Sequence, residues 1–244
     1  MKVLITFSAL ILFSLSLSAQ NDSSNKLGGM FKKATSVFSK NSSGGLSSDE
    51  IVSGLKEALS LGAQKSGDKL SALDGFYKDA AVKILLPQQV QSAEKRMRML
   101  GMGKLVDNAE LSMNRAAEDA AKSAAPIFLD AIKKMTVVDA LNILRGTDTA
   151  ATGYLRKTTT PELTSAFMPV IEASLKKTNA TEYWKDFFSA YNRVSSKKVD
   201  TDINSYVTSK ALYGIFYYVA QEEINIRKNP AGRVTDILKK VFGN

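Results

Sequence analysis

The sequence predicts an all-α protein: a single bundle of about eight or nine helices packed around a buried central helix. Apolar residues recur at helical spacing along most of the chain after residue 47, which is the primary signal for amphipathic helices. The run ALYGIFYYVA at 211–220 is apolar on every side, as is typical of a helix at the centre of a bundle. The short β-branched run 82–86 is stopped by Pro87. One strand cannot make a sheet, so we expect at most a short extended segment there.

Residues 1–19 have the pattern of a cleavable signal peptide. Lys2 gives a basic start, Val3–Leu17 is an apolar run, and Ala19 is a small residue suited to signal peptidase. The competing interpretation is an N-terminal membrane anchor, which needs about 20 apolar residues, and this run is shorter. We therefore expect export to the periplasm, or alternatively secretion.

Residues 20–47 are rich in Ser, Gly, Lys and Asn and predict a flexible tether before a helical domain at 48–244. A short basic amphipathic segment lies within the tether, and it could touch an anionic membrane weakly. The residues that would make this contact are Met30, Phe31, Lys32, Lys33 and Phe38. The alternatives are a partly ordered linker or a helix that lies back on the domain, because so short a helix is marginal in isolation.

The first helix of the domain is predicted to begin at Ser47, because Ser47 and Glu50 form a capping box before an apolar run. A polar, Gly-containing connection is expected at 65–74. A second helix starts at Pro87, since proline suits the first helical turn. We expect Gly101 to close that helix.

The third predicted helix, 104–123, carries an apolar arc that is mostly alanine, so a neighbouring helix is expected to approach closely there. Another helix covers 125–135. Thr136 and Asp139 then cap a short helix, which ends at Gly146.

Thr160 and Pro161 predict the start of a separate helix, as an N-cap followed by proline at the first helical position. The aromatic residues of 183–191 predict a helix whose rings belong to the core. The longest helix is expected at 200–228, and a final one at 234–242.

The composition excludes several kinds of chemistry. The chain has no cysteine and no histidine, which removes disulfides, cysteine-linked lipid anchors, Ser-His-Asp catalysis and His-ligated metal sites. Its net charge of +9 would suit an anionic membrane face, a polyanion or nucleic acid. However, acids and bases alternate and no nucleic-acid motif is present. We predict no nucleic-acid partner, no metal and no cofactor.

Several segments resemble a bacterial family catalogued as domain of unknown function 4197. They are VKILLP at 82–87, ELSMNRAAE at 110–118, FLDAIKKMTVVDALNIL at 128–144, GTDTAATGYLRKTT at 146–159, VTSKAL at 207–212 and AQEEINIRKNP at 220–230. The resemblance covers the chain from about residue 48 to its end. It implies an exported helical protein and supplies no catalytic residues. The chain has Leu85 where the commoner wording, VKIPLP, has a proline.

A helical bundle can enclose a pocket lined by apolar residues and a few convergent polar ones. Polar residues at the edges of the predicted apolar faces are candidates to line it: Glu110, Asn114, Arg115, Arg156, Lys210 and Glu222. The competing interpretation is a buried polar network that only fixes the register of the helices. We therefore predict a non-enzymatic module that binds a small molecule or an envelope component.

A carboxylate-based hydrolase acting on cell-envelope material is the alternative. Its candidates are Glu110 with Glu118, Asp148, and Glu222 with Glu223. Such an enzyme needs two carboxyl groups about 5–10 Å apart across a cleft. Helical ion pairs explain the same spacings without catalysis, so no residue is assigned as catalytic, and whether the chain is an enzyme stays open.

Overall fold

The computed structural model describes residues 47–194, 196, 198, 202–229, 236, 239 and 241. The predicted signal peptide, almost all of the predicted tether and its basic amphipathic segment lie outside the described residues. So does most of the predicted last helix. The predictions made for these parts of the chain stay predictions.

The described residues form α-helices, and the all-α prediction is confirmed. The elements are α2 (Ser48–Ser71), η1 (Gln88–Val90, a short 3-10 helix), α3 (Gln91–Met99), α4 (Gly103–Ala121), α5 (Ala124–Lys134), α6 (Val137–Arg145), α7 (Ala150–Lys177), α8 (Ala180–Val194) and α9 (Ile203–Lys228). No strand occurs within the described ranges. Residues 83–87 are neither helix nor strand, so the segment near 82–86 does not pair into a sheet.

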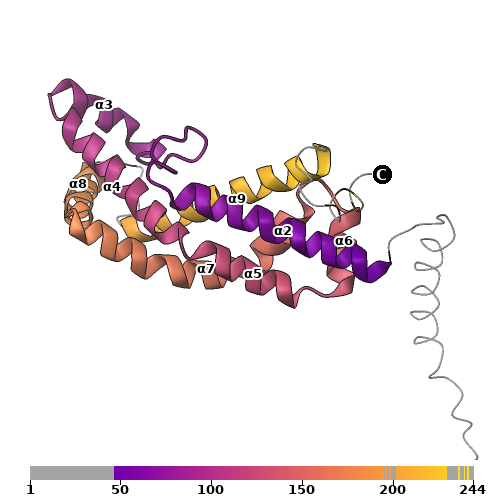
Figure 1. Ribbon diagram of the computed structural model, residues 1–244. Coiled ribbons are helices and arrows are strands. Elements are labelled where there is room, and N and C mark those ends of the chain that lie inside the picture. Colours follow the sequence, from indigo (N-terminus) through magenta and orange to yellow (C-terminus); the bar gives the residue numbers. More distant parts are fainter. Residues whose placement is uncertain are drawn as a thin grey trace, which may run out of the picture. The chain divides into compact units, whose positions relative to one another are not determined.

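Helix α9 is the central helix of the bundle. It packs against α2, α4, α7 and α8, and Figure 1 shows it beside α2. Val207, Ala211, Ile215 and Val219 follow one another at i, i+4 spacing and are buried. Tyr213 is 54% exposed, so the helix reaches the surface along one side. Among the described helices, none has both the length and the apolar content that crossing a bilayer requires.

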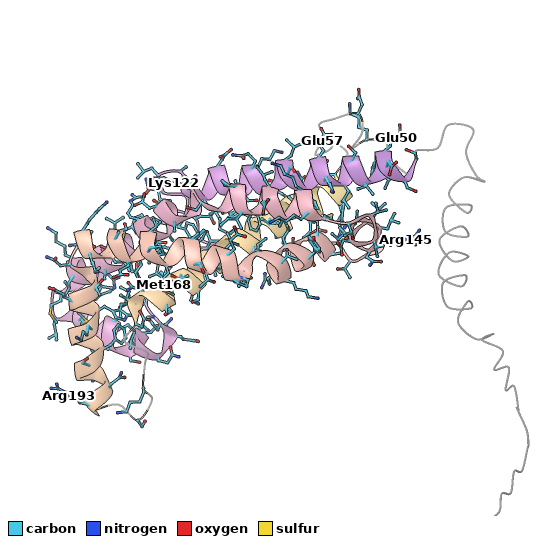
Figure 2. The ribbon with its side chains drawn as sticks, turned by 90° about the horizontal axis from the view of Figure 1, so that it is seen from below. Glu50, Glu57, Lys122, Arg145, Met168 and Arg193 are labelled. Atoms are coloured by element: carbon cyan, nitrogen blue, oxygen red, sulfur yellow. The ribbon has the colours of Figure 1, made fainter. Side chains whose placement is uncertain are left out.

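The bundle has two distinct ends. Figures 1 and 2 place α6, with Arg145 at its last turn, at one end beside the start of α2 at Glu50. Helix α8, which carries Arg193, turns away from the long axis of α2 and α7 at the opposite end. Helix α3 and the start of α4 lie at this second end as well. The second end is where the helices leave space for a site.

Small residues let the helices approach closely. Ala116, Ala117 and Ala120 of α4 are fully buried on the face that packs against α7 and α9, as the alanine-rich arc predicted. Gly214 of α9 lies against the ring of Phe76. A methyl group added at Gly214 would sit 2.5 Å from the Phe76 Cε1 atom, so only glycine fits there without a shift of the ring.

Helix α2 is longer than predicted, and the connection expected at 65–74 is wrong over most of its length. The helix continues to Ser71, and Ser66, Gly67 and Leu70 are buried on it. The charged residues of this stretch, Lys65, Asp68 and Lys69, are exposed on the solvent side of the helix. Tertiary burial of the apolar side holds the helix despite its glycines, each of which costs about 1 kcal/mol relative to alanine.

Helix α7 is continuous through Pro161, so the separate helix predicted to start at Thr160 is wrong. Buried Leu155, Thr159, Leu163 and Phe167 follow at i+4 steps on both sides of Pro161. An internal proline costs about 3 kcal/mol, whereas full burial of one Leu or Phe side chain contributes about 1.5–3 kcal/mol. The continuous apolar face therefore outweighs the local preference of the proline.

Candidate functional site

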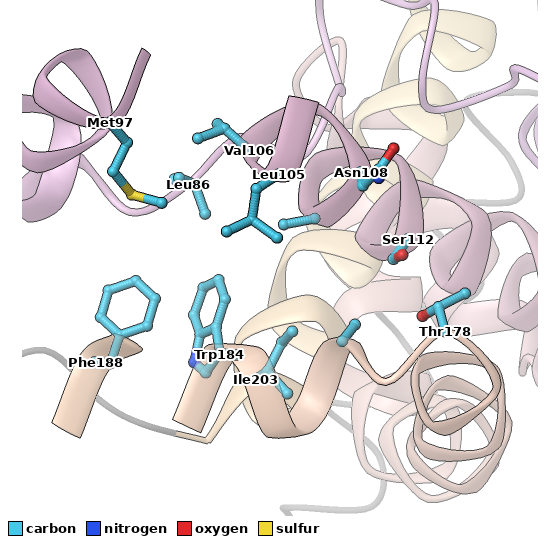
Figure 3. Close-up of a pocket in the computed structure, with 12 residues that line it drawn as sticks. Leu86, Met97, Leu105, Val106, Asn108, Ser112, Thr178, Trp184, Phe188 and Ile203 are labelled. Atoms are coloured by element: carbon cyan, nitrogen blue, oxygen red, sulfur yellow. The ribbon is translucent and has the colours of Figure 1, made fainter. Parts of the chain in front are cut away.

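A cavity of about 240 Å³ lies at the second end of the bundle, where α3, α4, α8 and the start of α9 meet. Figure 3 shows its walls, with α4 on one side and α8 on the other. Most of the side chains that line it are apolar. The lining residues are Leu86, Met97, Leu105, Val106, Asn108, Ala109, Ser112, Thr178, Ala180, Trp184, Phe188 and Ile203.

The helical repeat brings these residues onto facing surfaces. On α4, Leu105, Asn108, Ala109 and Ser112 recur at i, i+3, i+4 and i+7 and so share one face. On α8, Ala180, Trp184 and Phe188 recur at i+4 steps. Space remains between the two helices because Ala109 and Ala180 contribute only methyl groups to the walls.

The cavity is polar at one end and apolar at the other. Asn108, Ser112 and Thr178 gather at the end away from Met97 and Phe188 (Figure 3). Asn108 and Thr178 are exposed, and Ser112 is half-buried. Their hydroxyl and amide groups therefore stand where a polar group could be solvated, while the other end of the cavity is hydrocarbon and aromatic.

Aromatic rings form one wall. The Trp184 ring lies 4.3 Å from the Phe188 ring and 5.6 Å from the Tyr206 ring, centroid to centroid. Tyr206 donates a hydrogen bond of 2.8 Å from its hydroxyl to the Leu85 carbonyl, and burial raises the pKa of Tyr206 to about 12. Trp184 is the single tryptophan of the chain and is buried, so its fluorescence reports on this cavity alone.

Three of the predicted site residues, Glu110, Asn114 and Arg115, come together away from the cavity, against the loop between α2 and α3. Asn114 is fully buried and binds Ile84 of the irregular segment before α3: the Ile84 N–H donates to Oδ1 and Nδ2 donates to the Ile84 carbonyl, both at 2.8 Å. Glu110 lies 3.3 Å from Lys83 in an ion pair. These contacts hold residues 83–84 against α4.

Arg115 also helps to hold the loop between α2 and α3 against α4. Its guanidinium donates to Glu118 at 2.6 Å and to Asp74 at 2.7 Å. Glu118 in turn accepts hydrogen bonds from the backbone N–H groups of Phe76 and Tyr77, each at 3.1 Å. The hydrogen bond to Glu118 raises the pKa of Arg115. The α4 polar residues thus fasten the loop between α2 and α3.

The other three predicted residues have separate neighbours. Arg156 is exposed, with its guanidinium carbon 4.9 Å from the centre of the Phe216 ring. Lys210 is exposed, and its Nζ lies 5.6 Å from the Tyr206 ring centre. Glu222 forms an ion pair of 3.6 Å with Lys65 of α2.

None of the six predicted residues is among the side chains that line the described cavity. A ligand-binding role for them stays a prediction. The contacts above give the α4 group a structural role of the kind that the polar-network interpretation expected.

The family follows from a comparison with family models. The model described as "Protein of unknown function (DUF4197)" matches residues 45–243. The chain belongs to the DUF4197 family. No curated protein and no solved structure matches it.

Two of the DUF4197-like segments bind two others in space. ELSMNRAAE holds VKILLP through Asn114, as described. AQEEINIRKNP holds the start of GTDTAATGYLRKTT through Glu223, whose carboxylate accepts from the Ala151 N–H at 2.9 Å and from the Thr152 N–H and hydroxyl at 2.8 Å. Thr149, the N-cap residue of α7, makes no side-chain cap. Glu223 therefore caps α7 from another helix.

The carboxylates considered for hydrolysis are engaged in these contacts. Both oxygens of Glu118 accept hydrogen bonds, and so do both oxygens of Glu223. Asp148 forms an ion pair of 2.5 Å with Lys228. Such contacts within and between helices are those expected of ion pairs that stabilise the fold.

Sequence reasoning missed the cavity. It assigned the aromatic residues of 183–191 to the core and the apolar arc of 104–123 to a helix–helix contact, and Trp184 and Val106 of these two segments are indeed buried. Periodicity identifies an apolar face but does not tell whether a neighbour fills it completely. The available signal was the run KRMRMLGMGKL at 95–105, whose methionines and leucines exceed what a short surface helix needs.

Proposed function

We propose that this domain is a non-enzymatic binding module of the cell envelope whose ligand is an amphiphile with one hydrocarbon chain. The observation that carries the proposal is the cavity between α4 and α8, with hydrocarbon and aromatic walls and polar groups at one end. Pockets of this composition bind apolar ligand bodies and use a few polar groups to orient them. The hydrocarbon part would lie against Trp184 and Phe188, and the polar part beside Ser112 and Thr178.

The size of the cavity limits the ligand. A volume of about 240 Å³ is below the range of roughly 300–1,000 Å³ that encloses drug-sized molecules. It exceeds the volume of about 150 Å³ at which an engineered dry cavity takes benzene. A single short alkyl chain fits this space, and a whole two-chain lipid does not. A periplasmic location, supported by the apolar run Val3–Leu17, would expose the domain to such amphiphiles.

Intrinsic fluorescence tests the proposal directly. Titration with dodecanoate or with a single-chain lysophospholipid is expected to change the emission of Trp184 in a saturable way, because the ligand would contact the indole. Native mass spectrometry of the same samples should show one bound molecule per chain. The lysophospholipid has ester bonds, so its spectra would also reveal cleavage products if the domain hydrolysed it.

Variants that fill the cavity with a larger side chain test whether the ligand binds there. Ala109→Leu and Ala109→Phe place carbon atoms in the empty volume, so each should weaken binding by about tenfold or more, equivalent to about 1.4 kcal/mol. Filling a cavity commonly stabilises a fold by about 0.5–2 kcal/mol, so the melting temperature of Ala109→Leu should not fall. Ala173→Phe, at an exposed position of α7, is the control and should bind normally. Unchanged affinity in a folded Ala109→Leu variant would contradict the proposal.

A further inference from the structure

The turn between α3 and α4 exposes a cluster of large apolar side chains. None of the residues of α3 is buried, so this helix has an open outer surface. The exposed apolar side chains of this tip are Met99 (78% exposed), Leu100 (75%), Met102 (42%) and Leu105 (43%). Gly101, with a φ of 83°, makes the sharp turn that brings them together at one end of the bundle.

Basic side chains surround this tip. Lys95 and Arg96 precede it, and Lys104 follows it; all three are exposed. In the part of the chain that the structure describes, these three cations make no ion pair, whereas neighbouring Arg98 pairs with Glu94 at 2.9 Å and with Asp107 at 2.7 Å. The tip therefore combines apolar side chains with uncompensated positive charge.

We propose that the α3–α4 tip, residues 95–105, docks this protein on the surface of a bilayer that contains anionic lipids. Charge complementarity selects this occupant: each Lys or Arg near an anionic membrane contributes about 1 kcal/mol. The apolar side chains at the turn would enter the boundary between headgroups and acyl chains. An apolar protein partner would explain Met99 and Leu100, but it gives no reason for three exposed cations that form no ion pair with any described residue.

The tip is continuous with the cavity. Met97 and Leu105 belong to the tip and also line the cavity, as Figure 3 shows for both side chains. Docking would therefore place the apolar end of the cavity next to the lipid phase. This continuity rests on the same cavity as the proposed function, but the docking step itself does not require a ligand inside it.

A single fluorescent label tests the docking. Because the chain has no cysteine, Leu100→Cys in the full chain gives one attachment site for an environment-sensitive dye. With vesicles of phosphatidylglycerol and phosphatidylethanolamine, the label should shift to shorter wavelength and become protected from an aqueous quencher. Val138→Cys, at an exposed apolar position of α6 at the other end of the bundle, is the matched control and should stay accessible.

Charge variants test the choice of occupant. Replacing Lys95, Arg96 and Lys104 together by Gln should weaken vesicle binding on the order of a hundredfold, since each charge accounts for about a fivefold change. The control removes the same charge from exposed side chains at the end of α5 and of α6, Lys133, Lys134 and Arg145. It should change binding by less than about threefold, because these side chains lie at the end of the bundle opposite the tip, where Figure 2 places Arg145, and salt screens charges that are far from the lipid.

Three outcomes would overturn the inference. The label at Leu100→Cys could remain in water while the protein binds vesicles, which would assign binding to another part of the chain such as residues 30–38. The two triple variants could lose the same affinity, or vesicles of phosphatidylcholine alone could bind equally well. Failure of dodecanoate to bind in the cavity would overturn the proposed function but would leave these docking results unchanged.

Discussion

Asn114 forms with Ile84 the two hydrogen bonds that a neighbouring β-strand would otherwise provide. Its side-chain amide accepts from the Ile84 N–H and donates to the Ile84 carbonyl, with both bonds at 2.8 Å. Nδ2 also lies 2.7 Å from the Glu110 carbonyl. Ile84 and Asn114 are both buried, so neither backbone group of Ile84 can find water instead. One side chain thus satisfies both backbone groups of Ile84, whose segment pairs with no strand among the described residues.

Replacing Asn114 by Leu should destabilise the domain strongly. The substitution leaves the buried N–H and C=O of Ile84 unpaired, and each such group costs about 1–3 kcal/mol. We expect a loss of about 2–4 kcal/mol in the free energy of unfolding, measured by urea denaturation. Asn142→Leu, on the exposed side of α6, is the control and should change stability by less than about 0.5 kcal/mol. Equal effects of the two changes would contradict the role assigned to Asn114.

Glu223→Gln should loosen the start of α7. The carboxylate caps the N–H groups of Ala151 and Thr152 and pairs with Arg227 at 3.0 Å. Arg227 also donates to the Ile143 carbonyl. Breaking a buried ion pair on one side costs about 3–5 kcal/mol.

Hydrogen exchange gives a local measure of the same change. The amides of Ala151 and Thr152 should exchange faster in the Glu223→Gln variant, before the rest of α7 does. Glu172→Gln, which breaks an exposed ion pair with Lys176, should cost less than about 1 kcal/mol. If the exchange of the two amides were unaffected, the capping role of Glu223 would be wrong.

Two glycines should respond to alanine in opposite directions. Gly214→Ala forces a methyl group to within 2.5 Å of the Phe76 ring, which is fully buried. We expect a net loss of about 1–2 kcal/mol, since overpacking exceeds the gain in helix propensity. Gly153→Ala meets nothing within 4 Å and should stabilise α7 by about 0.5–1 kcal/mol. Thermal unfolding of both variants checks the difference in sign.

The half-buried phenol of Tyr206 should make stability fall at alkaline pH. Burial raises its pKa from 10.0 to about 12, so folding favours the neutral form. The stabilisation is fully present below pH 10 and is lost as the pH rises from 10 toward 12. Urea denaturation across this window should show a decline that is smaller in Tyr206→Phe. Tyr213→Phe, which removes a phenol from an exposed residue, should keep the decline of the unmodified protein.

The helices follow from local sequence where local and tertiary preferences agree. The Thr136 and Asp139 capping box, the stop at Gly101 and the alanine arc of α4 are all present as predicted. Pro161 shows the limit. Its local preference is for a helix start, but the buried face from Leu155 to Phe167 continues across it. The free energy gained by burying several apolar side chains exceeds the cost of one proline inside the helix.

The polar residues show a similar division. Sequence alone selected Glu110, Asn114, Arg115 and Glu222 as polar groups at the margins of apolar faces. It could not tell whether they meet a ligand or the backbone of another segment, because that depends on contacts between residues far apart in the chain. Asn114 and Ile84 are 30 residues apart, and Glu223 and Thr152 are 71 apart.

The sequence by itself determined the helical class and the absence of histidine and cysteine chemistry, because both depend on residue type and short-range spacing. Only the tertiary structure decided where helices fail to fill the space between them. The cavity beside Trp184 and the open tip at Leu100 are such places. Each depends on how α3, α4 and α8 meet, and the apolar period of a single helix carries no information on that meeting.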